Sequence, residues 1–306
     1  MIKLSDLKFV NTDTPFPVAA LELLSAQMNI VAHFYKKIGE NYTSELLHDM
    51  RVSFRRLQAM MNAFMPHLTD DLNAGKKSSN ILTAIRDMIR VLSKARTFDV
   101  SFEIVNEYLK KFNGNLTLNL LSGELRVRKV KALDKMYKSD VFIGFGKQIK
   151  KISRFLDFEL RKNISDEIKN SSFREVYSEI IIKGFERSIV NTSVIFFPSD
   201  MTAFIHAYRI ALKPLRYLFD IGESSFGTDF DKMKDKIKNL VELLGDFNDC
   251  SNTFDISEKI IKNDELRNPE YLRYLFMLRK KMLSMYDDVC ISLKALKQEN
   301  IKLIFT

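Results

Sequence analysis

The sequence is poor in residues that make turns and covalent cross-links. Its 306 residues include ten glycines, six prolines and two cysteines. So few glycines and prolines disfavour an all-β or α/β fold, because such folds need many tight turns. Cys250 and Cys290 form neither a C-x-x-C pair nor a disulfide framework, so we expect a reducing, cytoplasmic setting.

Membrane, export and catalytic motifs are also missing. The longest apolar run, around residues 180–182, ends at Lys183, far short of the roughly 18 residues of a membrane span. The N-terminal MIKLSDLKFV lacks the charged-then-apolar pattern of an export signal. There is no glycine-rich phosphate loop, no H-E-x-x-H and no Ser-His-Asp order. We therefore expect a soluble, intracellular protein that is not an enzyme and uses no metal or cofactor.

What the sequence does contain is apolar bulk and positive charge. Hydrophobic residues make up 46% of the chain, enough for a sizeable core. The 48 basic and 39 acidic residues are interleaved and leave a net charge of +9. This charge favours a polyanionic or acidic partner, and the interleaving argues against a disordered basic tail.

The spacing of apolar residues is helical, and no stretch alternates as a strand would. The predicted helices span 18–38, 46–65, 81–92, 100–112, 124–137 and 142–160, then 173–196, 202–221, 232–244, 248–262 and 269–300. Polar or glycine-containing connections are expected at 70–79, 113–123 and 222–228. We therefore predict an all-α fold of two four-helix-type bundles, residues 1–140 and 141–306, related by an internal pseudo-twofold repeat.

The predicted repeat depends on two stretches, Leu46–Met65 and Thr202–Ile221, which align on their histidines. On a helix with about 100° per residue, each stretch has an apolar face opposite a cationic face. The cationic faces carry His48, Arg51, Arg55 and Arg56 in the first stretch, and His206, Arg209, Lys213, Arg216 and Tyr217 in the second. A basic face is typical of any solvated amphipathic helix, but solvation does not require a histidine three residues before each basic cluster.

These residues make the chain similar to a known family. H-x-x-R-V-x-x-R-R-L from His48, and H-x-x-R-x-x-L-K-x-L-R-Y from His206, resemble the signatures of the CHAD domain, the conserved histidine α-helical domain. A second pair of motifs follows in the same order in both halves. LSKARTFDV at 92–100 resembles the family's L-G-x-x-R-D-x-D-V, and LGDFND at 244–249 resembles its L-G-x-x-N-D.

The chain departs from the family's pattern at three positions. Ser93 stands where the family has glycine, and Thr97 where it has its first aspartate. Pro214 stands where the first copy has Arg56, so one cation is missing from the second helix. We expect Arg216 to supply that charge from the next turn.

The CHAD family binds inorganic polyphosphate, so the resemblance implies a non-catalytic protein with a central cationic cleft on which both signature histidines converge. The implied polyphosphate ligands are His48, Arg51, Arg55, Arg56, His206, Arg209, Lys213, Arg216 and Tyr217. Further candidates on other helices are Lys183, Arg187, Arg126 and Lys129. Supporting roles, as helix caps or as partners that orient basic side chains, fall to Arg96, Asp99, Asn248 and Asp249.

Two alternatives remain open. A basic α-helical protein can hold nucleic-acid phosphates without contacting bases, although the aromatic residues here follow core periodicity and form no stacking platform. His48-Asp49 also resembles the pair of HD-type metal phosphohydrolases, with His33 and Asp99 available, but the second copy has Ala207 at the matching place. The Glu-x-Glu-x-Lys pattern of triphosphate tunnel enzymes is absent, so we expect a polyphosphate-metabolising enzyme to act in trans. We expect no membrane partner, and association with polyphosphate granules is a further expectation.

Overall fold

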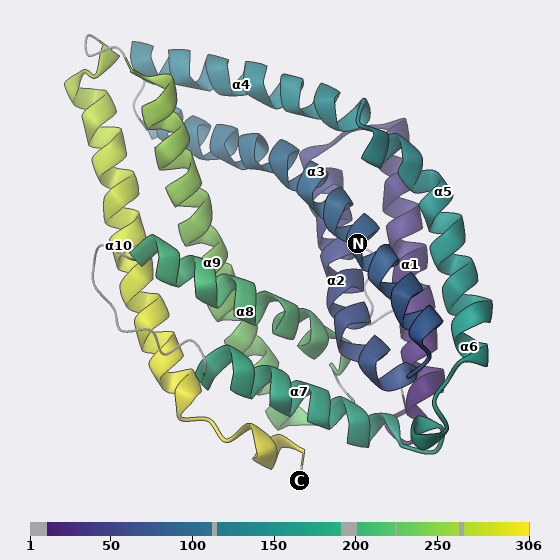
Figure 1. Ribbon diagram of the computed structural model, residues 1–306. Coiled ribbons are helices and arrows are strands. Elements are labelled where there is room, and N and C mark those ends of the chain that lie inside the picture. Colours follow the sequence, from purple (N-terminus) through teal and green to yellow (C-terminus); the bar gives the residue numbers. More distant parts are fainter. Residues whose placement is uncertain (1–10, 112–114, 191–200, 224, 263–265, 306) are drawn as a thin grey trace.

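The computed structural model describes residues 11–111, 115–190, 201–223, 225–262 and 266–305, and it is helical throughout (Figure 1). No strand occurs within these residues, so the predicted all-α class is confirmed. The first helices are α1 (Phe16–Glu40), α2 (Ser44–Leu68), α3 (Leu72–Lys111), α4 (Leu116–Tyr137) and α5 (Asp140–Arg154). A π-helical turn (Phe155–Glu159), the short α6 (Leu160–Lys162) and a 3-10 turn (Asp166–Ile168) follow. The remaining elements are α7 (Phe173–Val190), α8 (Met201–Ile221), α9 (Thr228–Ile260), α10 (Pro269–Lys297) and a 3-10 turn (Ile301–Ile304).

Side-chain caps and prolines determine several helix ends. Thr43 accepts a hydrogen bond from the Leu46 amide, at 3.0 Å, where α2 begins. Asn268 caps α10 in the same way, directly before Pro269, whose ring suits the first helical position. The predicted end of the first signature helix at residue 65 is wrong. α2 continues through Pro66 to Leu68, which is fully buried, so core packing outweighs the backbone hydrogen bond that the proline removes.

Two helices are longer than the sequence predicts. α3 contains 40 residues and α9 contains 33, whereas we expected a connection at 70–79 and a break inside each helix. The connection is wrong because Ala74 and Ser78, small residues four positions apart, are buried on the same side of α3 as Ile85. Gly245 does not interrupt α9, because one glycine costs only about 1 kcal/mol in a helix and Leu244 beside it is fully buried.

The connection predicted at 113–123 is also wrong. α4 begins at Leu116, and the Asn115 side chain accepts a hydrogen bond from the Leu118 amide at 2.8 Å. Leu118, Leu121 and Leu125 are fully buried at helical spacing, so core packing outweighs the glycine at position 123. The predicted helix 173–196 corresponds to α7, and its last residues, 191–196, lie outside the described part of the chain.

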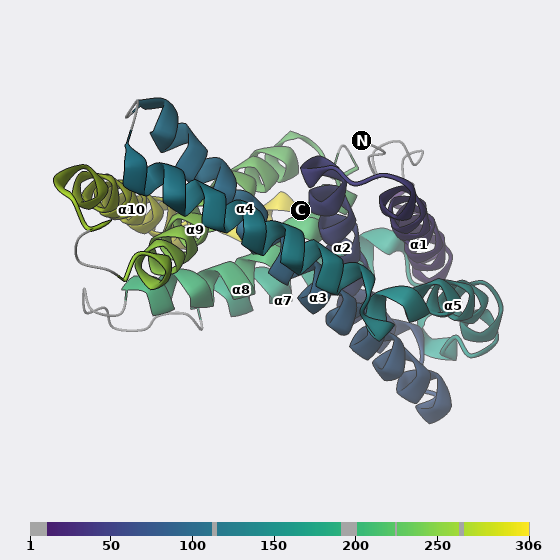
Figure 2. The same cartoon turned by 90° about the horizontal axis from the view of Figure 1, so that it is seen from above.

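Helices pack in the same order in both parts of the molecule. α2 packs on α1 and α3, and α4 packs on α3; likewise α8 packs on α7 and α9, and α10 packs on α9. Corresponding helices also meet across the molecule, α1 with α7, α2 with α8 and α3 with α9. This pattern is what a twofold repeat would produce, and the exact symmetry stays a prediction. Figure 2 shows α4 running along the molecule, with α9 and α10 at one end and α1 and α5 at the other.

One apolar core runs through helices of both parts. Aromatic rings join α1 to α7, because Phe16 stacks on Phe173 with 6.2 Å between ring centroids, and Phe173 stacks on Tyr177 at 4.8 Å. Gly222, directly after α8, has no room for a side chain, since a Cβ atom there would lie 2.6 Å from the Phe230 ring. None of the described helices combines the length and the apolar character needed to cross a membrane. The contacts of α2 with α3 and α8, and of α9 with α3 and α8, place these four helices at the centre.

Candidate functional site

A cleft of about 220 Å³ lies among the four central helices. α2 and α3 contribute His48, Arg51, Ser93, Arg96 and Thr97 to its walls. α8 contributes Arg209, Lys213, Arg216 and Tyr217, and α9 contributes Glu242, Asp246, Asn248 and Asp249. The structure therefore gathers most of the predicted signature-helix ligands, from both copies, around one space.

Most of the cations in and behind this cleft are not neutralised by ion pairs. Within the described residues, no ion pair involves Arg51, Arg55, Arg209, Lys213 or Arg216, although Arg51 Nε donates to Ser93 Oγ at 2.9 Å. The Nε atoms of Arg55, Arg209 and Arg216 are buried and have no hydrogen-bond partner among these residues. Buried polar groups normally have partners. The cleft thus holds donors that a bound acceptor could satisfy.

Crowding of like charges perturbs these groups. Burial, with the nearby charges of Arg209 and Arg51, lowers the pKa of Lys213 to about 6. Burial and the neighbouring Arg55 lower the pKa of Arg51 to about 10. Asp249 opposes both shifts but does not cancel them. An anion in the cleft would favour the charged form of Lys213 and interact with several guanidinium groups at once.

Tyr217 brings a neutral donor to the same place. Its side chain is 2% exposed, yet its hydroxyl has no hydrogen-bond partner in the described structure. Burial raises the pKa of the Tyr217 hydroxyl, while the nearby arginines Arg55 and Arg51 oppose the rise. The hydroxyl therefore stays protonated at neutral pH and can donate to an anionic oxygen.

The wall formed by α9 is acidic; our sequence analysis named Asp249 there as a supporting residue but missed Glu242 and Asp246. Glu242, Asp246 and Asp249 line the cleft at spacings of four and three residues, so they share one face of α9. Burial and the nearby Asp249 raise the pKa of Asp246. The i, i+4, i+7 spacing of three carboxylates was the available signal. This wall limits the excess of positive charge and leaves the cations of α2 and α8 as the anion-facing side.

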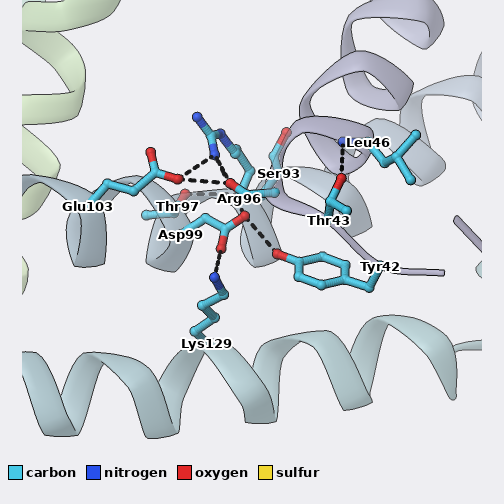
Figure 3. A network of polar contacts seen from close by, with 10 residues as sticks. Tyr42, Thr43, Leu46, Ser93, Arg96, Thr97, Asp99, Glu103 and Lys129 are labelled. Atoms are coloured by element: carbon cyan, nitrogen blue, oxygen red, sulfur yellow. Dashed lines mark hydrogen bonds and ion pairs between the residues drawn. The ribbon is translucent and has the colours of Figure 1, made fainter.

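A neighbouring cluster surrounds Asp99, which is fully buried in α3 (Figure 3). The Tyr42 hydroxyl donates to Asp99 Oδ2 at 2.8 Å, and Lys129 Nζ reaches from α4 to within 2.6 Å of Oδ1. Arg96 Nη1 lies 3.6 Å from Asp99 Oδ2 and 3.5 Å from Glu103 Oε1. The alternative in which Asp99 caps a helix is wrong, because α3 is continuous here. Asp99 holds two basic side chains instead.

The other predicted caps are wrong for the same reason. Asn248 and Asp249 lie inside the continuous α9, where backbone amides already have partners in the preceding turn. Both side chains line the cleft instead. Arg96 likewise lines the cleft from α3, so one cation of the Asp99 cluster faces the candidate site.

Several predicted ligands lie outside the cleft. His206 is exposed on α8 and is not part of the walls, so only His48 of the two histidines is there. Arg56 Nη2 pairs with Asp220 Oδ2 at 3.1 Å and joins α2 to α8. Lys183 pairs with Glu179 along α7. The remaining candidates outside the walls are Arg55, Arg187, Arg126 and Lys129.

The metal-dependent alternative depends on a cluster of histidine and acidic side chains. In the part of the chain that the structure describes, no group of three or more His, Cys, Asp or Glu side chains is placed to hold a metal ion. Asp99, which the HD-type alternative would use, is engaged by Lys129 and Arg96. Burial and the nearby Arg96 lower the pKa of His48, so its neutral ring offers one N–H donor at pH 7.

Comparisons with known proteins agree with this architecture. A family model, that of the CHAD domain, matches residues 30–253. The structure resembles PptA from Streptomyces chartreusis with a TM-score of 0.67 and 12% sequence identity, over 94% of this chain and 100% of that one. It also resembles the CHAD domain from the plant Ricinus communis, with a TM-score of 0.63 and 18% identity over 93% of this chain and 92% of that one. The search of curated proteins found no match.

Proposed function

Since this chain belongs to the CHAD domain family, we propose that it binds inorganic polyphosphate in the cleft between α2, α3, α8 and α9. CHAD domains are linked in general to polyphosphate binding. The observation that carries the proposal is the set of cleft cations without ion pairs, contributed by both signature helices. A linear polyanion fits such a set better than a compact ligand, because its charges are spread along a chain.

The proposed contacts divide by chemistry. Arg51, Arg209 and Arg216 each present a planar fork that can hold two phosphate oxygens, whereas Lys213 adds a point charge. Tyr217 adds a hydroxyl donor. Charge-assisted hydrogen bonds contribute roughly 1.5–3 kcal/mol each, and association costs at least about 4 kcal/mol. At the upper end of that range, four such contacts less the association cost leave roughly 8 kcal/mol, which corresponds to a dissociation constant of about 1 μM.

We further propose that binding involves no catalysis, and that any processing enzyme acts in trans. The lining residues support this, because among the described residues no group of histidine and acidic side chains is placed to hold the metal ions that a phosphohydrolase of the HD type would need. Incubation of the pure protein with polyphosphate and Mg²⁺ or Mn²⁺ should release no orthophosphate. Metal-dependent release that Asp49→Asn abolishes would instead support the phosphohydrolase alternative. A cytoplasmic location, with association to polyphosphate granules, belongs to the same proposal.

The test that separates polyphosphate from nucleic acid is a pair of calorimetric titrations. Polyphosphate and single-stranded DNA are compared at equal charge and equal salt concentration. We expect polyphosphate to bind more tightly, and its affinity to fall as salt rises, by analogy with the counterion release of about 0.7 per phosphate on single strands. Equal or tighter binding of DNA would favour the nucleic-acid alternative. An affinity that does not change with salt would contradict any polyanion site.

A second titration asks whether both halves form one site. Arg51→Ala and Arg209→Ala each remove a cation that faces the cleft, from α2 and α8 respectively. Each should weaken binding of a short polyphosphate by about 1.5–3 kcal/mol at unchanged stoichiometry. Halved stoichiometry with an unchanged residual affinity would mean two independent sites. Arg86→Ala, on the exposed part of α3, is the matched control because it also removes one positive charge.

A further inference from the structure

A second concave surface lies between α3 and α4. It is a groove of about 650 Å³, within the usual range for small-molecule sites. α4 residues from Glu124 to Met136 border it, with Ser139 just beyond the helix, so it extends roughly 18 Å along α4 at 1.5 Å per residue. Thr97 is the residue that it shares with the cleft, and its other lining side chains are separate.

The groove combines an apolar floor with a basic rim. Val91 and Phe98 of α3, with Ala132 and Met136 of α4, supply the apolar surface. The rim carries Lys94, Arg128, Lys131 and Lys135. Glu124 is the acidic lining residue, and it is engaged by Arg128 at 2.8 Å. In the described structure Lys94, Lys131 and Lys135 have no acidic partner, so the rim keeps a net positive charge.

Contacts beside the groove hold its two walls together. Lys129, which precedes the rim residue Lys131 by two positions, crosses from α4 to the buried Asp99 of α3. The same ammonium lies 5.6 Å from the centre of the Phe102 ring, also on α3. The separation of the helices is therefore set by a charged contact that does not depend on a ligand. A preformed groove loses less conformational entropy on binding than one that must open.

We propose that this groove binds an elongated amphiphilic anion, with an apolar body on the floor and a carboxylate or other acidic head group among the rim lysines. The apolar floor excludes polyphosphate as its ligand, because a fully charged chain gains nothing from burying Phe98, Ala132 or Met136. The rim excludes a neutral or cationic amphiphile as the preferred ligand, because three lysine charges stay unpaired beside it. The proposal does not rest on the function proposed for the cleft.

The absence of tryptophan from the sequence makes a specific test possible. Phe98→Trp places a single indole fluorophore on the groove floor, and Phe158→Trp places one on an exposed site of the π-helical turn. Each protein is titrated with decanoate below its micelle concentration, with decanol and with acetate. Calorimetry on the unmodified protein provides a measurement without any substitution.

We expect decanoate to give a saturable change in the indole fluorescence of the Phe98→Trp variant. The fluorescence of the Phe158→Trp variant should not change with decanoate, and acetate should change the fluorescence of neither variant. Lys131→Glu combined with Lys135→Glu should weaken decanoate binding about tenfold while leaving decanol binding unchanged. Lys147→Glu combined with Lys151→Glu, exposed lysines at the same spacing on α5, is the matched control and should have no effect. Circular dichroism confirms that each variant is folded. Equal responses of both fluorophores, no saturation, or equal loss in both double variants would overturn the proposal.

Discussion

Two neighbouring groups of basic side chains, one around Asp99 of α3 and one in the cleft, differ in how their charge is balanced. Around Asp99, the cations of Arg96 and Lys129 face a fully buried carboxylate. In the cleft, Arg209 and Lys213 lie close to other cations, and within the described residues neither forms an ion pair with the carboxylates of the α9 wall. We expect the first group to stabilise the fold, whereas the second suits the proposed binding of an external anion. Basic residues at helical spacing look the same in both cases, so only the position of the carboxylate tells them apart.

The largest effect is expected from a substitution that disrupts the group around Asp99. Asp99→Asn removes the carboxylate that balances Lys129 and Arg96 and leaves two partly buried cations facing an amide. Loss of one partner from a buried pair costs about 3 kcal/mol of unfolding free energy, and denaturant titration measures it. Asp134→Asn removes the exposed partner of Lys138 on α4 and should cost less than about 0.5 kcal/mol. A change below about 1 kcal/mol for Asp99→Asn would mean that the cluster is not stabilising.

A second prediction concerns pH and the charge state of Lys213. Its folded pKa of about 6 lies below the 10.5 of an ordinary lysine, because of burial and the nearby Arg209, Arg51 and Arg55. A polyanion restores the charge, so binding at pH 7–8 should take up a proton and weaken as pH rises, by less than tenfold per unit. Calorimetry in buffers with different ionisation enthalpies measures this uptake. Lys213→Arg should abolish it, because arginine is already charged.

The control for that experiment is His48→Gln, which tests the histidine that also lines the cleft. Removal of the His48 imidazole should leave the proton uptake unchanged if Lys213 is the group that takes up the proton.

Lys213 also affects the stability of the protein without ligand. Between about pH 6 and 10.5 the unfolded chain holds more protons at this site than the folded one, so the unfolding free energy should rise with pH. Lys213→Met should flatten that rise, and an unchanged slope would contradict the assignment.

A third, smaller effect comes from the Tyr217 hydroxyl. Tyr217→Phe removes a buried donor without a partner, so the unfolding free energy should stay the same or increase by up to about 1 kcal/mol. Polyphosphate affinity should fall by about 1 kcal/mol, since a hydroxyl contact is lost. A lower polyphosphate affinity together with an unchanged or higher unfolding free energy would identify the Tyr217 hydroxyl as a ligand contact. Tyr271→Phe, which also removes a buried hydroxyl without a partner, should leave binding unaffected.

The smallest effect is expected on α7. Lys183→Ala and Arg187→Ala change exposed side chains outside the cleft walls, so binding and stability should each change by less than about 0.5 kcal/mol. Titration of the double variant with polyphosphate measures this. A tenfold loss of polyphosphate affinity would show that the ligand also contacts α7, outside the cleft. It would mean that a lysine with an acidic partner, such as Lys183, can still bind the ligand.

The helical class, and the gathering of Arg51 and Lys213 at one cleft, could be predicted because helical spacing and a repeated motif can both be found in the sequence. Arg51 and Lys213 occur on the cationic faces of two amphipathic helices, and apolar faces opposite them determine which way they point. The lengths of α3 and α9 were not predictable in this way. Ala74 and Ser78 face the core although neither is strongly apolar, and Gly245 sits in α9 because its buried neighbours outweigh its cost.

Individual ligand assignments failed where they depended on the other half of the molecule. Arg56 follows Arg55 directly and shares its basic stripe, but it meets Asp220 of α8, a partner that no local pattern indicates. His206 matches His48 by alignment, yet only His48 lines the cleft. A helical wheel gives the direction of a side chain from its own axis. It does not give what the facing helix presents at that point.

The walls of the cleft come from distant parts of the chain, since α2 ends at Leu68 and α8 begins at Met201. During synthesis the ribosome releases α2 and α3 well before α8 and α9 exist. Until then, the side of α2 that packs on α8 has nothing to cover it, and the cleft has only the walls formed by α2 and α3. A polyanion that binds only the completed cleft would add RT ln(1 + [L]/Kd) to the stability of the finished fold, about 2.7 kcal/mol at a hundredfold excess over Kd. The ligand would then serve as a late assembly factor that secures the second half against the first.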